Sequence, residues 1–243
     1  MKVSILTALC NGQSPFVKEA IDSVKKQSYA DWEMLILDDA SKDDCYSEAI
    51  KYQDDRIKVF RNDERMYCAN TYQKLLEMAT GDICGVLDGD DCLAQNAMER
   101  IVGLYSKFKV GWIYTQSWWC NGELQPRRKG LSRLPVKGQL LLMGRMRKHC
   151  FSHWRTFKTE LRDRRKPLFE KDLKCAVDKS LGYVLEELAP GGFLDECLYY
   201  YRYHRENMSH KTAQRPVWGQ VVNRAVNRRT KKRIRPHGVV QVK

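Results

Sequence analysis

The sequence lacks the cysteine and hydrophobic patterns of disulfide-stapled, zinc-binding and membrane-spanning proteins. Its nine cysteines are an odd number and none are spaced C-x-x-C, so a reducing compartment is favoured. No apolar run approaches the ~20 residues that a membrane-spanning helix needs. The short apolar run after Met1 and Lys2 is followed by no small-residue cleavage site, so it is predicted to be a strand rather than a signal peptide.

Acidic residues are absent from the end of the chain. The net charge is +13, and residues 211–243 hold ten Lys and Arg but no Asp or Glu. Residues 127–166 hold fourteen Lys and Arg against two acids, which leaves a net charge of −9 on the rest of the chain. An acidic body with two basic segments indicates one function for the body and another for the segments.

Apolar strands alternate with helices over the first 105 residues. Strands are predicted at residues 3–9, 32–37, 57–60 and 83–87, and helices after Ser14-Pro15 and at 42–52, 67–79 and 94–105. This alternation predicts an α/β domain with a mostly parallel sheet flanked by helices. Further on, the pattern weakens to strands at 111–115 and 198–203, a loop at 120–137, and helices at 139–146, 173–188 and 216–234.

One stretch organises the chain, because three carboxylates follow its buried strand within four residues. They are Asp88, Asp90 and Asp91. Such a cluster costs electrostatic energy unless a cation lies among the carboxylates. Oxygen ligands favour Mg²⁺ or Mn²⁺, and open α/β sheets bind ligands at this end of their strands. The alternative is a solvated Asp/Gly turn.

Several ordered motifs resemble those of a known family. They are a first strand ending near Asn11, Gln27-Ser28-Tyr29 followed by Trp32-Glu33, Leu37-Asp38-Asp39-Ala40-Ser41, and Leu87-Asp88-Gly89-Asp90-Asp91. Together they resemble the family 2 glycosyltransferases over residues 1–105, with weaker agreement to about 210. The resemblance implies a GT-A fold over 1–210, with a nucleotide-sugar-binding half (1–105) and an acceptor-binding half (106–210). A basic tail, 211–243, would follow.

The resemblance also implies an activity. It is the inverting, Mn²⁺- or Mg²⁺-dependent transfer of a sugar from a nucleoside-diphosphate sugar, UDP-linked, to a hydroxyl of a glycan or lipid-linked acceptor, as in polysaccharide biosynthesis. The expected location is cytoplasmic, with a peripheral position at the inner face of the membrane.

The resemblance also implies which residues bind the donor and the metal. The metal ligands would be Asp90 directly, Asp88 as an outer or ribose contact, and His204. The remaining donor contacts would be Thr7, Asn11, Asp39, Arg65 and Arg202. Alternatives stay open for three of these residues: a turn or helix cap with Ser41 for Asp39, a solvated side chain for Arg65, and a structural role for His204.

Asp178 heads a predicted helix and resembles the family's general base. Inversion needs a single carboxylate near the acceptor hydroxyl, which is worth roughly 10²–10⁴ in rate. Asp172 and Glu170 are alternatives, and Asp178 could instead interact with its helix dipole. In the acceptor region His153 and Trp154 are candidates, with Trp154 either stacking on a sugar or lying in the core.

The basic tail is predicted to form an interfacial helix between Pro216 and Pro236. Its apolar residues, Trp218, Val221, Val222, Ala225 and Val226, fall on one face, and Lys and Arg cover much of the rest. This pattern is typical of a helix on an anionic membrane. Packing on the domain is the alternative.

Three other functions were weighed against sugar transfer. Nucleotidyl transfer is disfavoured because residues 10–13 form no Gly-rich basic loop. Nucleic-acid binding is not expected, since acids line the strand ends and no aromatic-interleaved RNA motif occurs. An inactive nucleotide-sugar-binding module would differ only in turnover.

Overall fold

The computed structural model describes residues 1–135, 151–171, 173–207 and 214–243, with side chains from 217 onward in the last range. Among these residues a ten-stranded sheet forms the centre of the molecule, in the order β10-β9-β6-β8-β4-β1-β2-β3, with β5 beside β9 and β7 beside β6. The strands are β1 (Val3–Leu9), β2 (Trp32–Asp38), β3 (Ile57–Arg61), β4 (Ile83–Val86), β5 (Cys92–Leu93), β6 (Trp112–Cys120), β7 (Pro126–Lys129), β8 (Arg155–Lys158), β9 (Gly191–Arg202) and β10 (Val239–Gln241).

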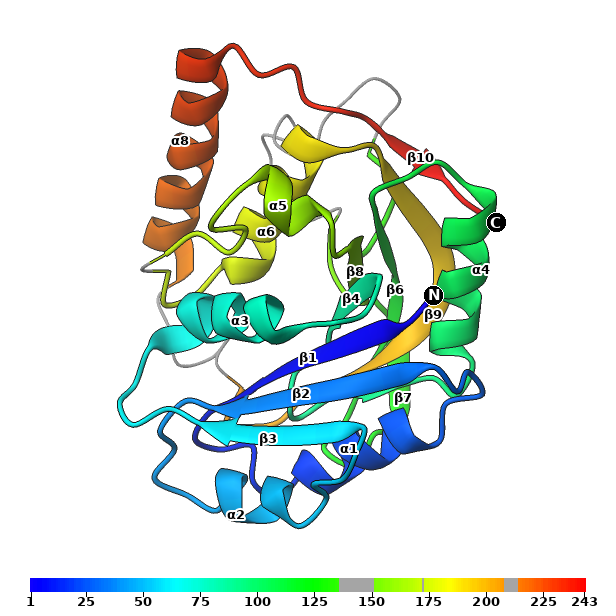
Figure 1. The fold of residues 1–243 in the computed structure, drawn as a ribbon, viewed down its shortest axis with the longest axis vertical. Coiled ribbons are helices and arrows are strands. Elements are labelled where there is room, and N and C mark those ends of the chain that lie inside the picture. The colour runs from blue at the N-terminus through cyan, green and yellow to red at the C-terminus, as the bar shows by residue number, and fades with distance from the viewer. Residues whose placement is uncertain (136–150, 172, 208–213) are drawn as a thin grey trace.

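Seven described helices flank the sheet (Figure 1). They are α1 (Val17–Lys25), α2 (Cys45–Ile50), α3 (Tyr67–Met78), α4 (Ala97–Lys107), α5 (Leu161–Arg164), α6 (Val177–Leu188) and α8 (Gln214–Lys232). Each of the eight described cysteines is a free thiol, in line with the absence of a disulfide framework.

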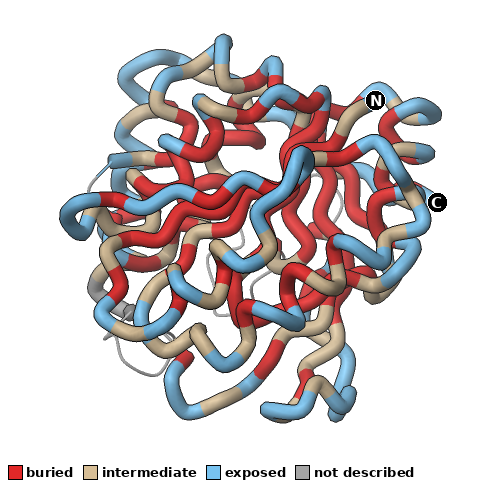
Figure 2. Tube along the Cα trace, turned by 60° about the horizontal axis from the view of Figure 1, so that its bottom comes forward, coloured by how far each residue is buried: buried red, intermediate tan, exposed pale blue. Residues whose placement is uncertain are grey.

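Alternation along β1 sends apolar side chains to both faces of the sheet. Val3 and Ile5 pack with α1, α2 and α4 in one core, and Leu6 packs with α3, α5, α6 and α8 in the other. Buried segments accordingly run through the strands, and exposed ones gather in the outer loops (Figure 2). A sheet covered on both faces explains why its strands are almost continuously apolar.

The half of the sheet that carries the carboxylate motif is parallel. Strand β1 lies between β2 and β4 and pairs in parallel with both. Leu9 is opposite Asp38, and Leu6 is opposite Val86. The carboxyl ends of these three strands therefore meet at one edge of the sheet, as the alternating pattern predicts.

The α/β class, the mostly parallel sheet and the flanking helices are confirmed, and several boundaries differ. Helix α1 begins at Val17, after a turn that contains Ser14 and Pro15. Strand β5 precedes α4, so Asp91 leads into a strand rather than a helix. The predicted loop at 120–137 contains β7, and β8, α5 and β10 were not predicted. The helix expected at 139–146 lies outside the described residues.

The basic tail packs against the domain. Val221 and Ala225 of α8 are buried, although Val226 is 44% exposed. Arg228 and Arg229 form ion pairs with Glu187 at 2.6 and 2.9 Å, and Arg229 also reaches Glu186. Further on, β10 pairs with β9. The apolar stripe therefore packs on the protein, and no helix in the described ranges is long and apolar enough to cross a membrane.

Candidate active site

A cavity of about 270 Å³ lies where β1, β2 and β4 end, and α3 and α6 supply part of its wall. Open α/β sheets bind ligands at this edge. Six predicted site residues line the cavity: Asp39, Arg65, Asp88, Asp90, His153 and Asp178. The other five do not line it: Thr7, Asn11, Trp154, Arg202 and His204.

Asp88 is a cavity carboxylate with both of its oxygens engaged. Its Oδ1 accepts a 2.7 Å hydrogen bond from the Tyr72 hydroxyl, and its Oδ2 accepts one of 3.2 Å from Arg155 Nη2. Burial by itself would raise the pKa of Asp88, but the charge of Arg155, together with His153 and Tyr72, holds that pKa well below its usual range. Asp88 is therefore a permanent anion at the centre of the site.

Asp91 also lines the cavity and is buried, with both oxygens engaged. It accepts 2.7 Å hydrogen bonds from the Tyr199 hydroxyl and from the backbone N–H of Arg202. Burial, followed by the charges of Asp90 and Asp88, raises the pKa of Asp91 well above its usual value. Burial and the two neighbouring carboxylates thus disfavour the ionised form of Asp91, and a cation bound nearby would favour it.

The structure brings together a candidate metal-binding group that differs from the predicted ligands Asp88, Asp90 and His204. Asp88, Asp91 and His153 offer ligand atoms that all lie within 4.8 Å of one another, and within the described ranges no other group of three does so. Two carboxylates and an imidazole suit Mn²⁺ or Mg²⁺. Burial, and then the nearby Arg155, lower the pKa of His153, so its ring is neutral and able to act as a ligand.

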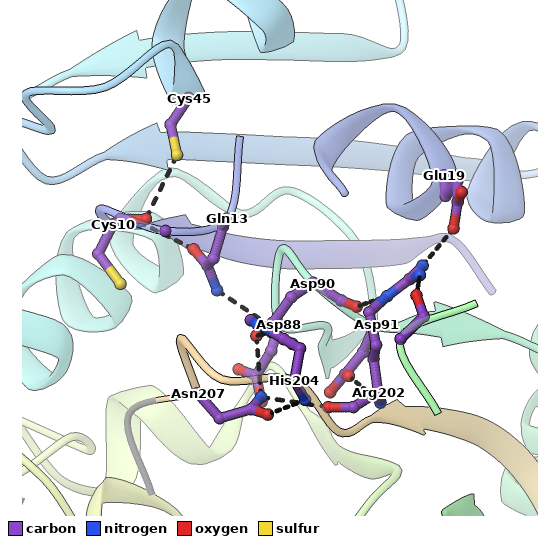
Figure 3. A network of polar contacts seen from close by, with 12 residues as sticks. Cys10, Gln13, Glu19, Cys45, Asp88, Asp90, Asp91, Arg202, His204 and Asn207 are labelled. Carbon is purple, nitrogen blue, oxygen red and sulfur yellow. Dashed lines mark hydrogen bonds and ion pairs between the residues drawn. The ribbon is translucent and has the colours of Figure 1, made fainter. Parts of the chain in front are cut away.

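Asp90 and His204, expected as ligands together with Asp88, contact each other instead. His204 Nε2 lies 2.9 Å from Asp90 Oδ2, while Gln13 donates to Oδ1 at 3.1 Å and Asn207 to Oδ2 at 3.3 Å. These contacts form the polar network in Figure 3. They tie the loops after β1, β4 and β9 together, so His204 has the structural role left open by the sequence.

Arg202 is buried beside this network and does not face a diphosphate in the cavity, contrary to the prediction. Its Nε donates to the Asp90 backbone oxygen at 2.8 Å, and its other nitrogens reach Glu19 and the Gly122 carbonyl. The guanidinium also lies 4.4 Å over the Phe16 ring. The hydrogen bond from Arg202 to the Asp90 backbone oxygen holds the loop after β4 in place (Figure 3).

Of the residues predicted to contact the base, Asp39 and Arg65 line the cavity. Asp39 accepts hydrogen bonds from the backbone N–H groups of Met66 and Tyr67 at 2.8 and 2.9 Å, so it caps α3 rather than acting with Ser41. Arg65 is exposed, with its guanidinium 5.2 Å from the Tyr67 ring.

Thr7 and Asn11 lie away from the cavity. Thr7 is buried within β1 and only 1% exposed. The Asn11 side chain instead accepts a 2.6 Å hydrogen bond from the Lys42 backbone. Neither residue lines the cavity, so their role as donor contacts stays a prediction: Thr7 is enclosed by the sheet, and Asn11 joins two loops.

Asp178 lines the cavity from the first turn of α6 and is half-buried. Ala176, with φ +57°, turns the chain into this helix. The alternative Glu170 accepts from Ser180 and pairs with Arg165 at 3.1 Å, so it is part of the α6–α8 contact. Asp172 lies outside the described residues.

Trp154 lies in the core, which is the second of the two positions that the sequence left open for it. It is fully buried, and a Cβ added at Gly85 would lie 2.5 Å from its ring. Its neighbour His153 is in the cavity, stacked on Tyr199 and Tyr201 with ring centroids 4.7 and 5.4 Å apart.

Sequence reasoning missed several cavity residues that contact the acids. They are Gln13, Tyr72, Arg155 and Asn207. The neighbouring thiol of Cys10 is not a nucleophile, because burial, followed by the charge of Asp90, raises its pKa to about 12. The cavity therefore offers carboxylates, cations and aromatic rings, and no activated thiol.

A cavity at the carboxyl ends of parallel strands, lined by an acidic cluster, is the place where open α/β domains bind their ligands. Comparison with known sequences narrows the class. The sequence profile described as "Glycosyl transferase family 2" matches residues 4–167, and the chain belongs to that family.

The match to one curated relative covers less of the chain than the family profile does. A 112-residue segment is 31% identical to the Escherichia coli protein named "UDP-Glc:alpha-D-GlcNAc-diphosphoundecaprenol beta-1,3-glucosyltransferase WfgD". The match covers 46% of this chain and 44% of WfgD, so the chain spans less than half the length of that relative.

Two solved structures share the fold. S. aureus TarS 1-349 in complex with UDP-GlcNAc matches with a TM-score of 0.73 and 18% identity, over 87% of this chain and 61% of that one. The mannosyltransferase PcManGT from Pyrobaculum calidifontis, in complex with GDP-Man and Mn²⁺, matches with a TM-score of 0.56 and 19% identity, over 76% and 52%. At these identities the likeness shows a common GT-A type fold.

Proposed function

We propose that this chain transfers a sugar, with inversion, from a UDP-sugar to a hydroxyl of a lipid-linked glycan. The observation that carries the proposal is the placement of Asp88, Asp178 and Arg65 around one cavity at the strand ends of a family 2 domain. WfgD is named for a UDP-linked donor and a lipid-linked acceptor, and TarS was solved with UDP-GlcNAc, which supports this choice of substrates.

The reaction follows from the distribution of charge around the cavity. The acceptor oxygen attacks the anomeric carbon while its proton passes to the Asp178 carboxylate. The bond between that carbon and the β-phosphate oxygen breaks, and its electron pair leaves with the nucleoside diphosphate. Arg65 and Lys174, which also line the cavity, provide positive charge for the phosphates.

Asp88, Asp91 and His153 are the residues that would hold a divalent cation. When bound, such an ion neutralises the charge that develops on the leaving diphosphate. Arg155 restrains Asp88 in its ionised form, and the Tyr199 hydroxyl bonded to Asp91 fixes the second carboxylate. The chain's own contribution is thus a pre-arranged acidic floor beneath the phosphates.

Donor binding is tested by a thermal-shift screen of UDP-, GDP- and CMP-sugars with and without Mn²⁺. A ligand at 100 times its Kd adds about 2.7 kcal/mol of stability. For a chain of this size that corresponds to a rise in Tm of roughly 5–10 °C. We expect this rise with a UDP-sugar and Mn²⁺ together and a smaller one without the metal. Failure of every UDP-sugar to raise Tm at millimolar concentration would contradict the proposal.

We also propose that the exposed end of α8 rests on an anionic membrane surface, where a lipid-linked acceptor resides. Val221 and Ala225 on the apolar face of α8 are buried, so the attraction would come mainly from exposed Lys231, Lys232 and Arg233. Each basic residue near an anionic leaflet contributes about 1 kcal/mol. Replacing all three by Glu should weaken binding to anionic vesicles at least tenfold at low salt.

The matched control for the vesicle experiment replaces Lys26, Lys58 and Lys109, three exposed lysines on other elements, by Glu. Both variants change the net charge equally, so their vesicle binding differs only if the end of α8 is the surface that contacts the membrane. Equal binding by the two variants in co-sedimentation would show that the end of α8 is no membrane element.

A further inference from the structure

A row of stacked side chains leads from the cavity to the surface of the sheet. His153 stacks on Tyr201 with centroids 5.4 Å apart, and Tyr201 packs against Trp119 at 5.3 Å. The guanidinium of Arg128 lies 4.1 Å from the Trp119 ring centroid. The row thus begins beside the acidic cluster and ends on β7.

Strand register places the last three members of this row on one face of the sheet. Trp119 of β6 pairs with Arg128 of β7 on one side and with Tyr201 of β9 on the other. Directly paired residues project to the same face. Since Tyr201 lines the cavity, Trp119 and Arg128 extend the cavity wall outward.

The outer end of the row is cationic and open. All four residues of β7 are exposed, and within the described ranges no acid pairs with Arg128, whereas the adjacent Lys129 pairs with Asp195 at 2.8 Å. A guanidinium stacked flat on an indole keeps its N–H edges free for phosphate oxygens. Tyr and Trp meanwhile offer broad apolar faces, which suit the C–H face of a sugar ring.

We propose that Tyr201, Trp119 and Arg128 form the acceptor site and that they bind a sugar carrying a diphosphate. This inference rests on the proposed function and adds the chemistry of the acceptor. The sugar would lie on Tyr201 and Trp119, with its reacting hydroxyl toward the cavity, and its diphosphate would lie on Arg128 near the surface. The row is aromatic near the cavity and cationic at the surface, and such an acceptor likewise has its sugar at one end and its diphosphate at the other.

The test uses a synthetic N-acetylglucosaminyl diphosphate bearing a short alkyl chain, and the same sugar joined to that chain without the diphosphate. Binding to the full chain is measured by calorimetry without donor. We expect Arg128→Gln to weaken the diphosphate probe at least tenfold and to leave the neutral probe unchanged. Trp119→Ala should weaken both probes.

Neighbouring residues on the opposite face of the same strands supply matched controls. Arg127→Gln removes the same charge from β7, and Trp118→Ala removes an indole from β6. Neither should change the affinity of either probe. Equal losses for Arg127→Gln and Arg128→Gln, or no binding of the diphosphate probe by the unaltered chain, would overturn the proposal. Inorganic diphosphate binding as tightly as the probe would also overturn it, because the sugar would then contribute nothing.

Measurements of donor binding distinguish a failure of this inference from a failure of the proposed function. The UDP-sugar thermal shift should be the same in all four variants, since none of the four residues lines the described cavity. A normal donor shift with unchanged acceptor binding in Arg128→Gln refutes the acceptor site alone. Loss of the donor shift in the unaltered chain refutes the proposed function itself.

Discussion

Asp178→Asn is expected to lower kcat by 10²–10⁴ while the donor-induced rise in Tm stays the same. The substitution preserves the shape of the side chain and removes the group that accepts the proton of the acceptor hydroxyl. Asp178 lines the cavity from the start of α6 and does not belong to the Asp88, Asp91 and His153 group. Steady-state kinetics with saturating donor, beside thermal shifts with the same donor, separate chemistry from binding.

Glu170→Gln is the matched comparison for Asp178→Asn. Glu170 pairs with Arg165 and Arg228 and accepts from Ser180, so it joins α6 to α8. Its loss should lower Tm without a selective fall in kcat. Normal turnover by Asp178→Asn, together with an inactive Asp172→Asn, would assign the base to Asp172 instead.

The first half of the fold follows from hydrophobic periodicity. Strands β1, β2 and β4 are buried on both faces, and helices α1 and α3 show one apolar side, so local pattern and tertiary role agree. Strand β7 was missed because its sequence, Pro126 to Lys129, is exposed and basic and carries no apolar signal. Strand β8 is short, and its Arg155 is buried by contact with Asp88, which only the tertiary structure reveals.

Some predicted site residues lie outside the cavity because the sequence does not reveal which face of the sheet a side chain occupies. Adjacent residues of a strand point to opposite faces. Arg155 therefore faces the cavity while its neighbour Trp154 packs in the core with Ile83 and Met98. The same parity separates Tyr201, which lines the cavity, from Arg202, which is buried beside Glu19.

The acidic motif was located correctly, but its division of labour was not visible in the sequence. The sequence of three nearby carboxylates does not indicate which of them would bind a cation. That assignment depends on Tyr72, Arg155 and Tyr199, which come from α3, β8 and β9. The placement of Asp88 and Asp91 near His153 is therefore a tertiary property.

Asp88→Asn is expected to abolish the Mn²⁺-dependent part of the donor-induced Tm shift and to lower transfer by at least 10²-fold. Removing a carboxylate from the group around a divalent cation weakens both metal binding and stabilisation of the leaving diphosphate. The variant also leaves Arg155 buried without its anion, a loss of about 3–5 kcal/mol in stability. The shift must therefore be compared with that variant's own Tm in the absence of metal.

Asp90→Asn decides between the two assignments of the metal ligands. In the structure Asp90 forms hydrogen bonds with Gln13, His204 and Asn207. The side-chain amide that replaces its carboxylate should therefore disturb these loop contacts and leave the Mn²⁺ dependence in place. If Asp90→Asn instead loses Mn²⁺ dependence and Asp88→Asn retains it, Asp90 is the direct ligand that the sequence motif suggests. Full transfer by both variants in excess chelator would contradict either assignment, because neither carboxylate would then act through a cation.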